Sequence, residues 1–91
     1  MKTGIELIAE ERQRQIEVEG WTPAHDSQHD ESELLFAAEA YLMRPFMKNE
    51  DLIKLWPWHK EWWKPTPENR IRELQKAGAL IAAEIDRLQR M

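Results

Sequence analysis

Two carboxylates at the start of an expected helix have the spacing that most strongly suggests chemistry. Asp30 and Glu33 lie three positions apart and directly precede the apolar and small residues of 34–38. Residues i and i+3 share one face of a helix, so both carboxylates would point to one spot, and hard cations such as Mg²⁺ prefer clustered oxygen ligands. Acids at a helix start also stabilise the free N–H groups of the first turn. The spacing therefore predicts either a metal-binding pair or an ordinary helix cap.

Charged residues on two other expected helices extend this candidate site. Glu73 and Lys76 have the same spacing on the last expected helix, and Glu10 lies on the first. In an antiparallel bundle Glu73 would face the pair on the middle helix, and Glu10 would complete the acidic cluster. The alternative is that these residues are solvated, as most charged helix residues are. Arg70, Arg72 and Lys76 are candidates for binding phosphate oxygens or for pairing with neighbouring acids.

Other catalytic chemistry finds little support in the composition. The chain has no Cys, which excludes disulfides, thiolate zinc sites and thiol nucleophiles. His25, Asp26 and His29 lie close in sequence, but a zinc site needs three or four ligands, so a surface or hydrogen-bonding role is favoured for them. The three glycines are scattered, and the sequence has no Gly-rich phosphate loop.

Length and charge restrict the class of protein. The 91 residues predict one small domain, residues 1–91, with a modest core that an oligomer partner would extend. The net charge of −4, from 17 acids and 13 bases, argues against direct binding of nucleic acid. The first residues lack the apolar core of a signal peptide, and no apolar run has the length of a membrane span. We therefore expect a cytoplasmic protein without a membrane partner.

Helical periodicity predicts an all-α fold, a small bundle of three main helices with an aromatic-rich loop. The first helix is expected over residues 3–19, with an apolar stripe that includes Ile5, Ile8 and Ile16. The second is expected over about 28–43, and the third over 67–90, with Thr66 as cap and Pro67 at the first helical position. The apolar stripe of the last helix consists of Ile71, Leu74, Gly78, Ile81, Ile85 and Leu88.

The connection between the second and third main helices is the least regular part of the sequence. Residues 49–55 are expected to form a short helix with Asn49 as its cap, and residues 55–65, with two prolines, a loop or short turns. The four Trp side chains of 56–63 carry too much apolar area to be left in water. They would wrap the core, line a pocket or meet a second subunit. Gly78, among Ala residues, predicts the close approach of another helix.

Elements along nearly the whole chain resemble a family of small phage and prophage proteins. They are Glu19-Gly20-Trp21-Thr22-Pro23-x-His25-Asp26, Glu33-Leu34-x-x-Ala37-Ala38-x-x-Tyr41, Trp56-Pro57-Trp58, Trp63-Lys64-Pro65 and Lys76-Ala77-Gly78-Ala79-Leu80-Ile81. The family is the dATP/dGTP diphosphohydrolase N-terminal-like family. It is similar to the all-α nucleoside triphosphate pyrophosphohydrolases, the MazG-like enzymes, so the resemblance implies a single MazG-like domain over residues 1–91.

The resemblance implies a metal site. In that superfamily a Glu-x-x-Glu pair on one helix and a Glu-x-x-Asp pair on the next hold Mg²⁺ against a triphosphate. Carried over by position, it implies Asp30, Glu33 and Glu73 as ligands of Mg²⁺ or Mn²⁺. Lys76 stands where the superfamily has Asp, so it would contact the phosphates directly, together with Arg70.

The resemblance also implies a reaction. A (deoxy)nucleoside triphosphate, dATP or dGTP, would be converted to the monophosphate and pyrophosphate. Glu10 or Glu11 would orient or deprotonate the attacking water, and Trp21 or Trp58 would stack on the base. Members of the superfamily work as dimers or tetramers, so a homo-oligomer is expected, in the host cytoplasm if the protein is encoded by a phage.

The same residues support an alternative. Lys76 in place of Asp removes a metal ligand, and the Trp cluster of 56–63 offers a large apolar surface. The alternative hypothesis is a non-catalytic helical oligomer on the same fold, which acts as a phage or host protein-interaction module.

Overall fold

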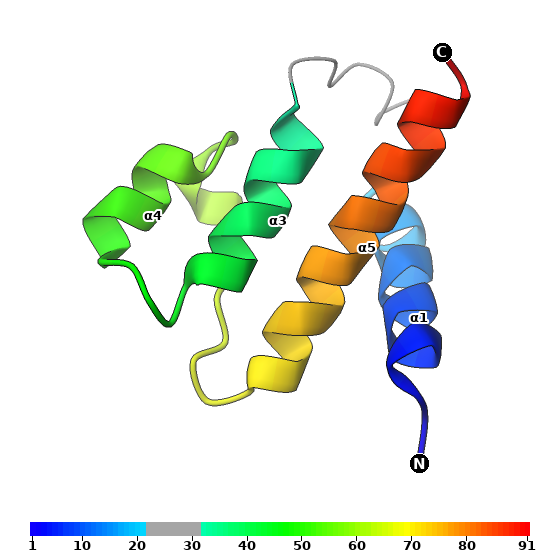
Figure 1. The fold of residues 1–91 in the computed structure, drawn as a ribbon, viewed down its shortest axis with the longest axis horizontal. Helices are drawn as coiled ribbons and strands as arrows, with labels where there is room; N and C mark the ends of the chain where they lie inside the picture. The colour runs from blue at the N-terminus through cyan, green and yellow to red at the C-terminus, as the bar shows by residue number, and fades with distance from the viewer. Residues whose placement is uncertain (22–31) are drawn as a thin grey trace.

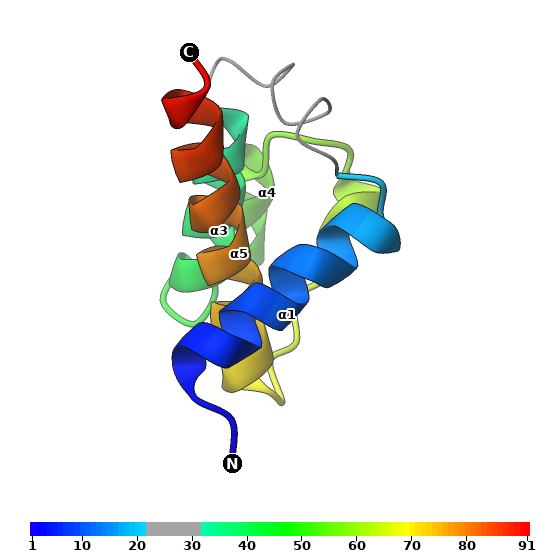
Figure 2. The ribbon, with the colours of Figure 1, turned by 90° about the vertical axis from the view of Figure 1, so that its right-hand side faces the viewer.

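The computed structural model describes residues 1–21 and 32–91, which contain four α-helices and one 3₁₀ helix. They are α1 (Gly4–Glu17), α3 (Glu33–Met43), α4 (Asn49–Leu55), η1 (Lys60–Trp62) and α5 (Arg70–Gln89). α5 is central, with α3 on one side and α1 on the other, and α4 packs against α3 (Figures 1 and 2). The described residues contain no strand, which confirms the predicted all-α class. None of their helices is long and apolar enough to cross a membrane.

The first helix begins and ends through local signals in the sequence. The Thr3 hydroxyl accepts a hydrogen bond from the Glu6 amide, and the Glu6 carboxylate accepts one from the Thr3 amide, so two free N–H groups of the first turn are satisfied. Gly20 follows the helix with a φ of +73°, in the left-handed region that glycine adopts without steric cost. Beyond it the Trp21 amide donates to the Gln15 carbonyl at 3.0 Å, which turns the chain back toward the helix.

The second main helix begins later than the sequence predicts. A helix from about residue 28 was expected, but α3 begins at Glu33, and Ser32 before it has a left-handed φ of +67°. Glu33 is thus the first residue of its helix, and the predicted pairing of Asp30 with Glu33 stays a prediction. Asp30 itself lies outside the described residues, as does the expected polar connection of 22–29 with His25, Asp26 and His29.

The last helix also begins later than predicted. Its cap is Asn69, whose side chain accepts from the Arg72 amide, and not Thr66. Thr66 instead closes a turn with Asn69, because the Asn69 amide donates to the Thr66 carbonyl at 2.8 Å. The short helix α4 occupies the predicted range of 49–55, although Lys48, not Asn49, is the capping residue.

The core lies between α3 and α5 and is built largely from small residues. Leu34, Ala37 and Ala38 of α3 and Ala77 and Leu80 of α5 are fully buried. Alanines at the contact let the two backbones approach closely, so little apolar volume is needed to fill the space between them.

α1 packs against α5 at the glycine where the sequence predicts a close approach. A Cβ atom built on Gly78 would lie 2.5 Å from Cδ1 and 2.7 Å from Cγ1 of Ile8. The expected contact is therefore confirmed, and the helix that fills it is α1 of the same chain.

Aromatic side chains of the loop after α4 cover one end of the core. Trp56 and Trp63 pack on Tyr41 of α3, with ring centroids 5.6 Å and 4.8 Å away. Trp58 extends the cluster to Trp21, which follows α1, at 5.3 Å. The Trp residues thus join the ends of α1 and α3, and two of the three roles expected for them, covering the core and lining a pocket, are realised.

The faces that the two amphipathic helices bury differ from those that the periodicity predicts. The described part of α1 buries Glu11 and Gln15, while Ile5 is 83% exposed. The side of α5 toward α3 buries Glu73 and Leu80 together with small residues such as Ala77. The expected stripe is left exposed, at Ile71, Leu74, Ile81, Ile85 and Leu88. The correction has a physical cause: small and ion-paired residues form the helix contacts, and the aliphatic stripe is left on the outside.

Candidate functional site

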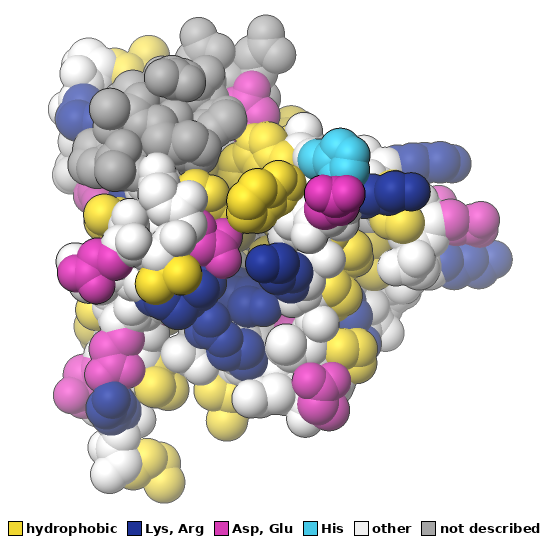
Figure 3. All heavy atoms as spheres, turned by 180° about the vertical axis from the view of Figure 1, so that it is seen from behind, with side chains coloured by type: hydrophobic (Ala, Val, Ile, Leu, Met, Phe, Trp, Pro, Cys, Tyr) yellow, Lys and Arg dark blue, Asp and Glu magenta, His cyan; other side chains and the backbone are white. Residues whose placement is uncertain are grey.

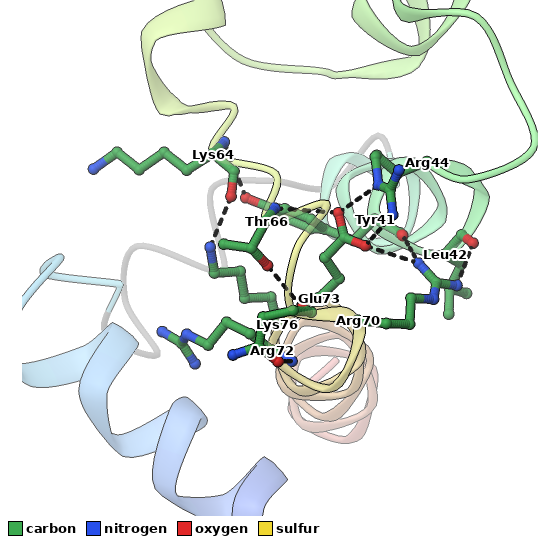
Figure 4. Close-up of polar contacts among 10 residues, drawn as sticks. Tyr41, Leu42, Arg44, Lys64, Thr66, Arg70, Arg72, Glu73 and Lys76 are labelled. Carbon is green, nitrogen blue, oxygen red and sulfur yellow. Dashed lines mark hydrogen bonds and ion pairs between the residues drawn. The ribbon is translucent and has the colours of Figure 1, made fainter.

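Glu73 lies at the centre of a closed ion-pair cluster between α3 and α5. Its carboxylate accepts hydrogen bonds from Nε and Nη2 of Arg44 at 2.7 and 3.0 Å. It also accepts from Arg70 at 3.2 Å and from the Thr66 amide at 3.2 Å (Figure 4). Burial would raise the pKa of Glu73, but the hydrogen bonds from Arg44 and Arg70 outweigh that effect and lower the pKa. The side chain is fully buried and all its visible bonding capacity is used.

Arg70 is also fully occupied by this cluster. Besides Glu73, its guanidinium donates to the carbonyls of Tyr41 and Leu42 at 2.8 and 2.7 Å. These carbonyls belong to the last turn of α3, whose C=O groups have no partner within the helix. Arg70 therefore caps α3 and joins it to α5, which is a structural role in place of the expected phosphate contact.

The residues expected to hold Mg²⁺ are not brought together within the described chain. Glu33 is the first residue of α3, whereas Glu73 binds Arg44, which directly follows the last residue of that helix. The 11 residues of α3 extend about 16 Å along the helix axis, so Glu33 and Arg44 lie at opposite ends of it. In the parts of the chain that the structure describes, no group of three or more His, Asp or Glu side chains could hold a metal ion. The described residues thus do not fit the metal site that the resemblance implies.

A second buried carboxylate, Glu11, joins α1 to α5. It accepts two hydrogen bonds from Arg14 at 2.7 and 2.9 Å. The Nη1 atom of Arg72 on α5 lies 2.7 Å from Oε1, the oxygen that also accepts from Arg14 Nε. The Gln15 amide nitrogen donates to it at 3.3 Å. Burial would raise the pKa of Glu11, but the hydrogen bonds from Arg14 and Arg72 outweigh it and lower the pKa. Arg14 also reaches Glu19 at 3.2 Å, so it links the two acids.

Above this cluster lies a cavity of about 140 Å³, which we call the basic cavity. Four cationic and two acidic side chains line it, so its wall carries an excess of positive charge although the whole chain is acidic. Figure 3 shows Lys and Arg side chains gathered on one face of the molecule, bordered by hydrophobic and acidic ones. The lining consists of Glu11, Arg14, Gln15, Glu19, Trp21, Tyr41, Trp62, Lys64, Arg72 and Lys76.

Lys76 is the less exposed of the two lysines in this wall. Its ammonium donates to the Lys64 carbonyl at 2.7 Å and lies 5.4 Å from the centre of the Tyr41 ring. No carboxylate of the described residues pairs with it. Burial, followed by the nearby Arg72 charge, lowers the pKa of Lys76. In Figure 4 Lys76 extends toward Lys64 and Arg72 toward α1, whereas Glu73 points toward Arg44.

Gln15 contributes an acceptor to the same wall. Its side-chain oxygen is buried and has no hydrogen-bond donor, and the residue is only 1% exposed. A buried acceptor without a donor costs about 1–3 kcal/mol relative to a satisfied one. The basic cavity therefore offers a ligand both an uncompensated ammonium and an unsatisfied oxygen.

An aromatic cavity of about 320 Å³ adjoins the basic one. Trp21, Trp58 and Trp62 line it, together with Glu19 and His59. Glu19, Trp21 and Trp62 belong to both linings, so the two cavities are adjacent. An anionic group and a flat aromatic group would each find a matching wall in one of them.

The residues expected at the site are divided by the structure. Lys76, Trp21 and Trp58 line the cavities, as a substrate site would require. Glu10 lies outside, more than half exposed and paired with Lys2 at 2.5 Å, so it faces neither cavity. Glu11, the other candidate for a water-orienting base, is buried.

Sequence reasoning did not identify Gln15 or Arg14 as site residues. Arg14 follows Glu11 by three positions and Gln15 follows it by four, so both lie on the same helix face as Glu11. That spacing was a usable signal for a polar cluster. The contact with Arg72, 61 positions later than Glu11, had no local signal.

No family model matches this chain in comparison with known proteins, and no curated protein or solved structure matches it either. Its function is therefore inferred from the geometry of the two cavities and from the resemblance noted above.

Proposed function

We propose that this protein binds a nucleoside triphosphate across the two joined cavities, with the phosphates in the basic cavity and the base in the aromatic one. The observation that carries the proposal is that Lys76 is only partly exposed and that no carboxylate of the described residues pairs with its ammonium group. A phosphate oxygen would supply the missing negative charge. Charge-assisted hydrogen bonds of this kind are about twice as strong as neutral ones.

Neighbouring cations support the placement of the phosphates. Arg72 lies beside Lys76 in the wall, and Lys64 lies at its rim, 5.7 Å from the centre of the Trp62 ring. Arg14 and Arg72 share Glu11, and Arg14 also pairs with Glu19, so the excess positive charge of the wall comes from Lys64 and Lys76. A polyanion is therefore a better match for this wall than a neutral molecule or a cation.

The aromatic cavity supports the placement of the base. Trp21 and Trp58 have ring centroids 5.3 Å apart with planes tilted by 50°, which gives a ligand two indole faces of different orientation. Stacking of a base on an aromatic side chain contributes about 1–3 kcal/mol. In the proposal the base stacks in the aromatic cavity, which adjoins the cations of the basic cavity.

The chemical step in the proposal comes from the resemblance to the MazG-like pyrophosphohydrolases. Water attacks the α-phosphorus of dATP or dGTP, and the bond from that phosphorus to the oxygen that bridges to the β-phosphate breaks. The products are pyrophosphate and the nucleoside monophosphate. Lys76 and Arg72 stabilise the negative charge that builds up on the phosphate oxygens in the transition state. The dependence on Mg²⁺ or Mn²⁺ belongs to the proposal through the resemblance alone, because the described residues do not form a metal site.

The proposal includes a homo-oligomer, for which the exposed apolar surface is the support. Leu35, Phe36 and Leu42 of α3 lie beside Ile81 of α5 around a shallow apolar hollow. Ile85 and Leu88 extend this surface, and each is about half exposed. A second copy that covers it would shield the aliphatic stripe that the single chain leaves in water. The alternative occupant is a different protein, which would make the chain an interaction module.

The first experiment measures binding and turnover together. Wild-type protein is titrated with dATP and dGTP, and pyrophosphate release is followed with and without Mg²⁺. Lys76→Met is compared with Lys54→Met, which removes the same charge from the exposed side of α4. We expect Lys76→Met to weaken binding by about tenfold or more and Lys54→Met to leave it unchanged. Equal binding by all three proteins would contradict the proposed site.

The two halves of the proposal have different readouts. Binding that depends on Lys76, without pyrophosphate release in any metal condition, would leave a nucleotide-binding protein and exclude the hydrolase. The oligomer is tested by sedimentation velocity of Ile85→Glu beside Val18→Glu, a more exposed apolar position at the end of α1. We expect only Ile85→Glu to dissociate the assembly.

A further inference from the structure

The side-chain oxygen of Gln15 is the one polar atom of the basic cavity that the described protein leaves both buried and unpaired. The orientation of its amide follows from chemistry. The nitrogen donates to the Glu11 carboxylate at 3.3 Å, and a flipped amide would place its oxygen against that negative charge. The free group is therefore an acceptor, and its missing partner must be a donor.

Gln15 lies close to the junction of the two cavities. Its side chain lines the basic cavity, and its backbone carbonyl accepts the Trp21 amide at 3.0 Å. Trp21 is one of the three residues that line both cavities. A nucleotide with its base on the Trp side and its phosphates on the Lys76 side would have its sugar next to Gln15.

The chemistry of a nucleotide narrows the possible donors. An ionised triphosphate offers only acceptor oxygens, and Lys76 and Arg72 already supply donors for it. The N–H groups of a base would lie in the aromatic cavity. Among the groups between base and phosphate, the sugar hydroxyls alone carry a proton that can be donated.

We propose that Gln15 is a specificity residue that accepts a hydrogen bond from a pentose hydroxyl of the bound nucleotide. The inference rests on the proposed triphosphate site and adds a substrate class to it, namely nucleotides whose sugar carries a hydroxyl at the 2′ or the 3′ position. A sugar that lacks both hydroxyls leaves the Gln15 oxygen buried without a donor, so the site discriminates against it.

The test compares four adenine nucleotides on the full-length protein by calorimetry, in buffer with Mg²⁺. They are the ribo, 2′-deoxy, 3′-deoxy and 2′,3′-dideoxy triphosphates, each with an α,β-methylene bridge that prevents turnover. We expect the dideoxy compound to bind about three- to tenfold more weakly than the best hydroxyl-bearing one. The two monodeoxy compounds show which hydroxyl is read, because only one of them should share the loss.

Gln15→Met assigns the effect to this residue, with Gln13→Met, an exposed position on the same helix, as the matched control. The readout is the ratio of dideoxy to hydroxyl-bearing affinity within each protein, which a general loosening of α1 does not change. We expect the ratio to rise to about one in Gln15→Met and to stay at the lower wild-type value in Gln13→Met. Wild-type protein alone gives the ratio if Gln15→Met does not fold.

The outcomes separate this inference from the function on which it rests. Equal affinity of wild-type protein for all four compounds would overturn the role of Gln15 and leave the triphosphate site in place. An unchanged ratio in a folded Gln15→Met would assign the hydroxyl contact to another residue and overturn the inference. Failure of all four compounds to bind would overturn the proposed function and this inference with it.

Discussion

The two buried glutamates of this protein, Glu11 and Glu73, have similar surroundings and different bonding states. Each is almost completely buried, each lies at a contact of α5 with another helix, and each is held by two arginines. In the Glu73 cluster every group has its partner, since Arg70 also binds two carbonyls of α3 and the Thr66 amide completes the carboxylate. No cavity described in the structure is lined by Glu73.

The Glu11 cluster is incomplete by comparison. Glu11 lines a cavity. Within the described residues the neighbouring Lys76 ammonium has no carboxylate partner, and the Gln15 side-chain oxygen has no hydrogen-bond donor. A complete cluster at a helix contact serves stability, because a ligand has nothing to add to it. An incomplete one keeps unsatisfied groups that a ligand can satisfy. The difference identifies the α1 side of α5 as the functional side, although the acid expected to do chemistry lies on the other.

The largest expected effect that sharpens this comparison is loss of stability in Glu73→Gln. Removal of the charge leaves Arg44 and Arg70 without their common counter-ion, and we expect a decrease of about 3 kcal/mol in the free energy of unfolding. Glu11→Gln should cost less, about 2 kcal/mol, because Arg14 keeps Glu19. Urea denaturation followed by Trp fluorescence measures both.

Ligand affinity gives the matching contrast between the two variants. Glu73→Gln should leave triphosphate binding unchanged where the protein is folded, whereas Glu11→Gln should strengthen it by removing a negative charge from the cavity wall. Weaker triphosphate binding by fully folded Glu73→Gln would mean that the Glu73 cluster also takes part in binding, which contradicts the structural role assigned to it.

A smaller loss of stability is expected in acid. The pKa values of both glutamates lie below their ordinary value of 4.5, because arginine hydrogen bonds outweigh burial. The stabilisation is therefore complete above about pH 4.5 and is lost as the pH falls through the lowered pKa values. Unfolding free energies at pH 6, 4.5 and 3.5 should fall in that order, with a shallower decrease in Glu73→Gln and in Glu11→Gln. An equal slope in all three proteins would exclude these carboxylates as the cause.

The contact that holds α1 over the cavity can be disturbed at Gly78. In Gly78→Ala the new methyl group would overlap Ile8, an overpacking that costs about 1–3 kcal/mol, and the better helix propensity of Ala returns about 1 kcal/mol. We expect a net loss of about 1 kcal/mol. Gly4→Ala, which meets nothing within 4 Å, is the control. A stable Gly78→Ala that binds nucleotide normally would show that α1 can move away at little cost.

The helical class and the position of α4 could be predicted from the sequence, because periodicity and helix-breaking residues act locally. The buried faces could not. Glu11 and Gln15 are polar, and a pattern that scores each residue alone places them outside, whereas Arg72 from the far end of the chain makes the burial of Glu11 possible. The exposed Ile85 and Leu88 show the reverse case, in which apolar periodicity marks a face that the single chain leaves open.

The candidate site was predictable to a similar extent. Lys76 and Trp21 were identified from residue type and resemblance, and both line the cavities. Glu73 was expected to bind a metal because of the family resemblance, but its carboxylate binds Arg44, 29 positions earlier. A sequence pattern shows which groups can bind a metal or phosphate. It does not show which of them already have a partner.

The smallest expected effect concerns the pH dependence of binding at Lys76. Burial and the charge of Arg72 lower the pKa of Lys76 from its ordinary value of 10.5, so its proton is lost at a lower pH than in a solvated lysine. Phosphate binding favours the charged form, and affinity should therefore fall as the pH rises through the lowered pKa. Between pH 7 and 9 we expect the affinity of wild-type protein for the adenine triphosphate analogue to fall more steeply than that of Lys76→Met. The variant corrects for ionisation of the nucleotide itself, and parallel pH profiles for the two proteins would remove Lys76 from the binding site.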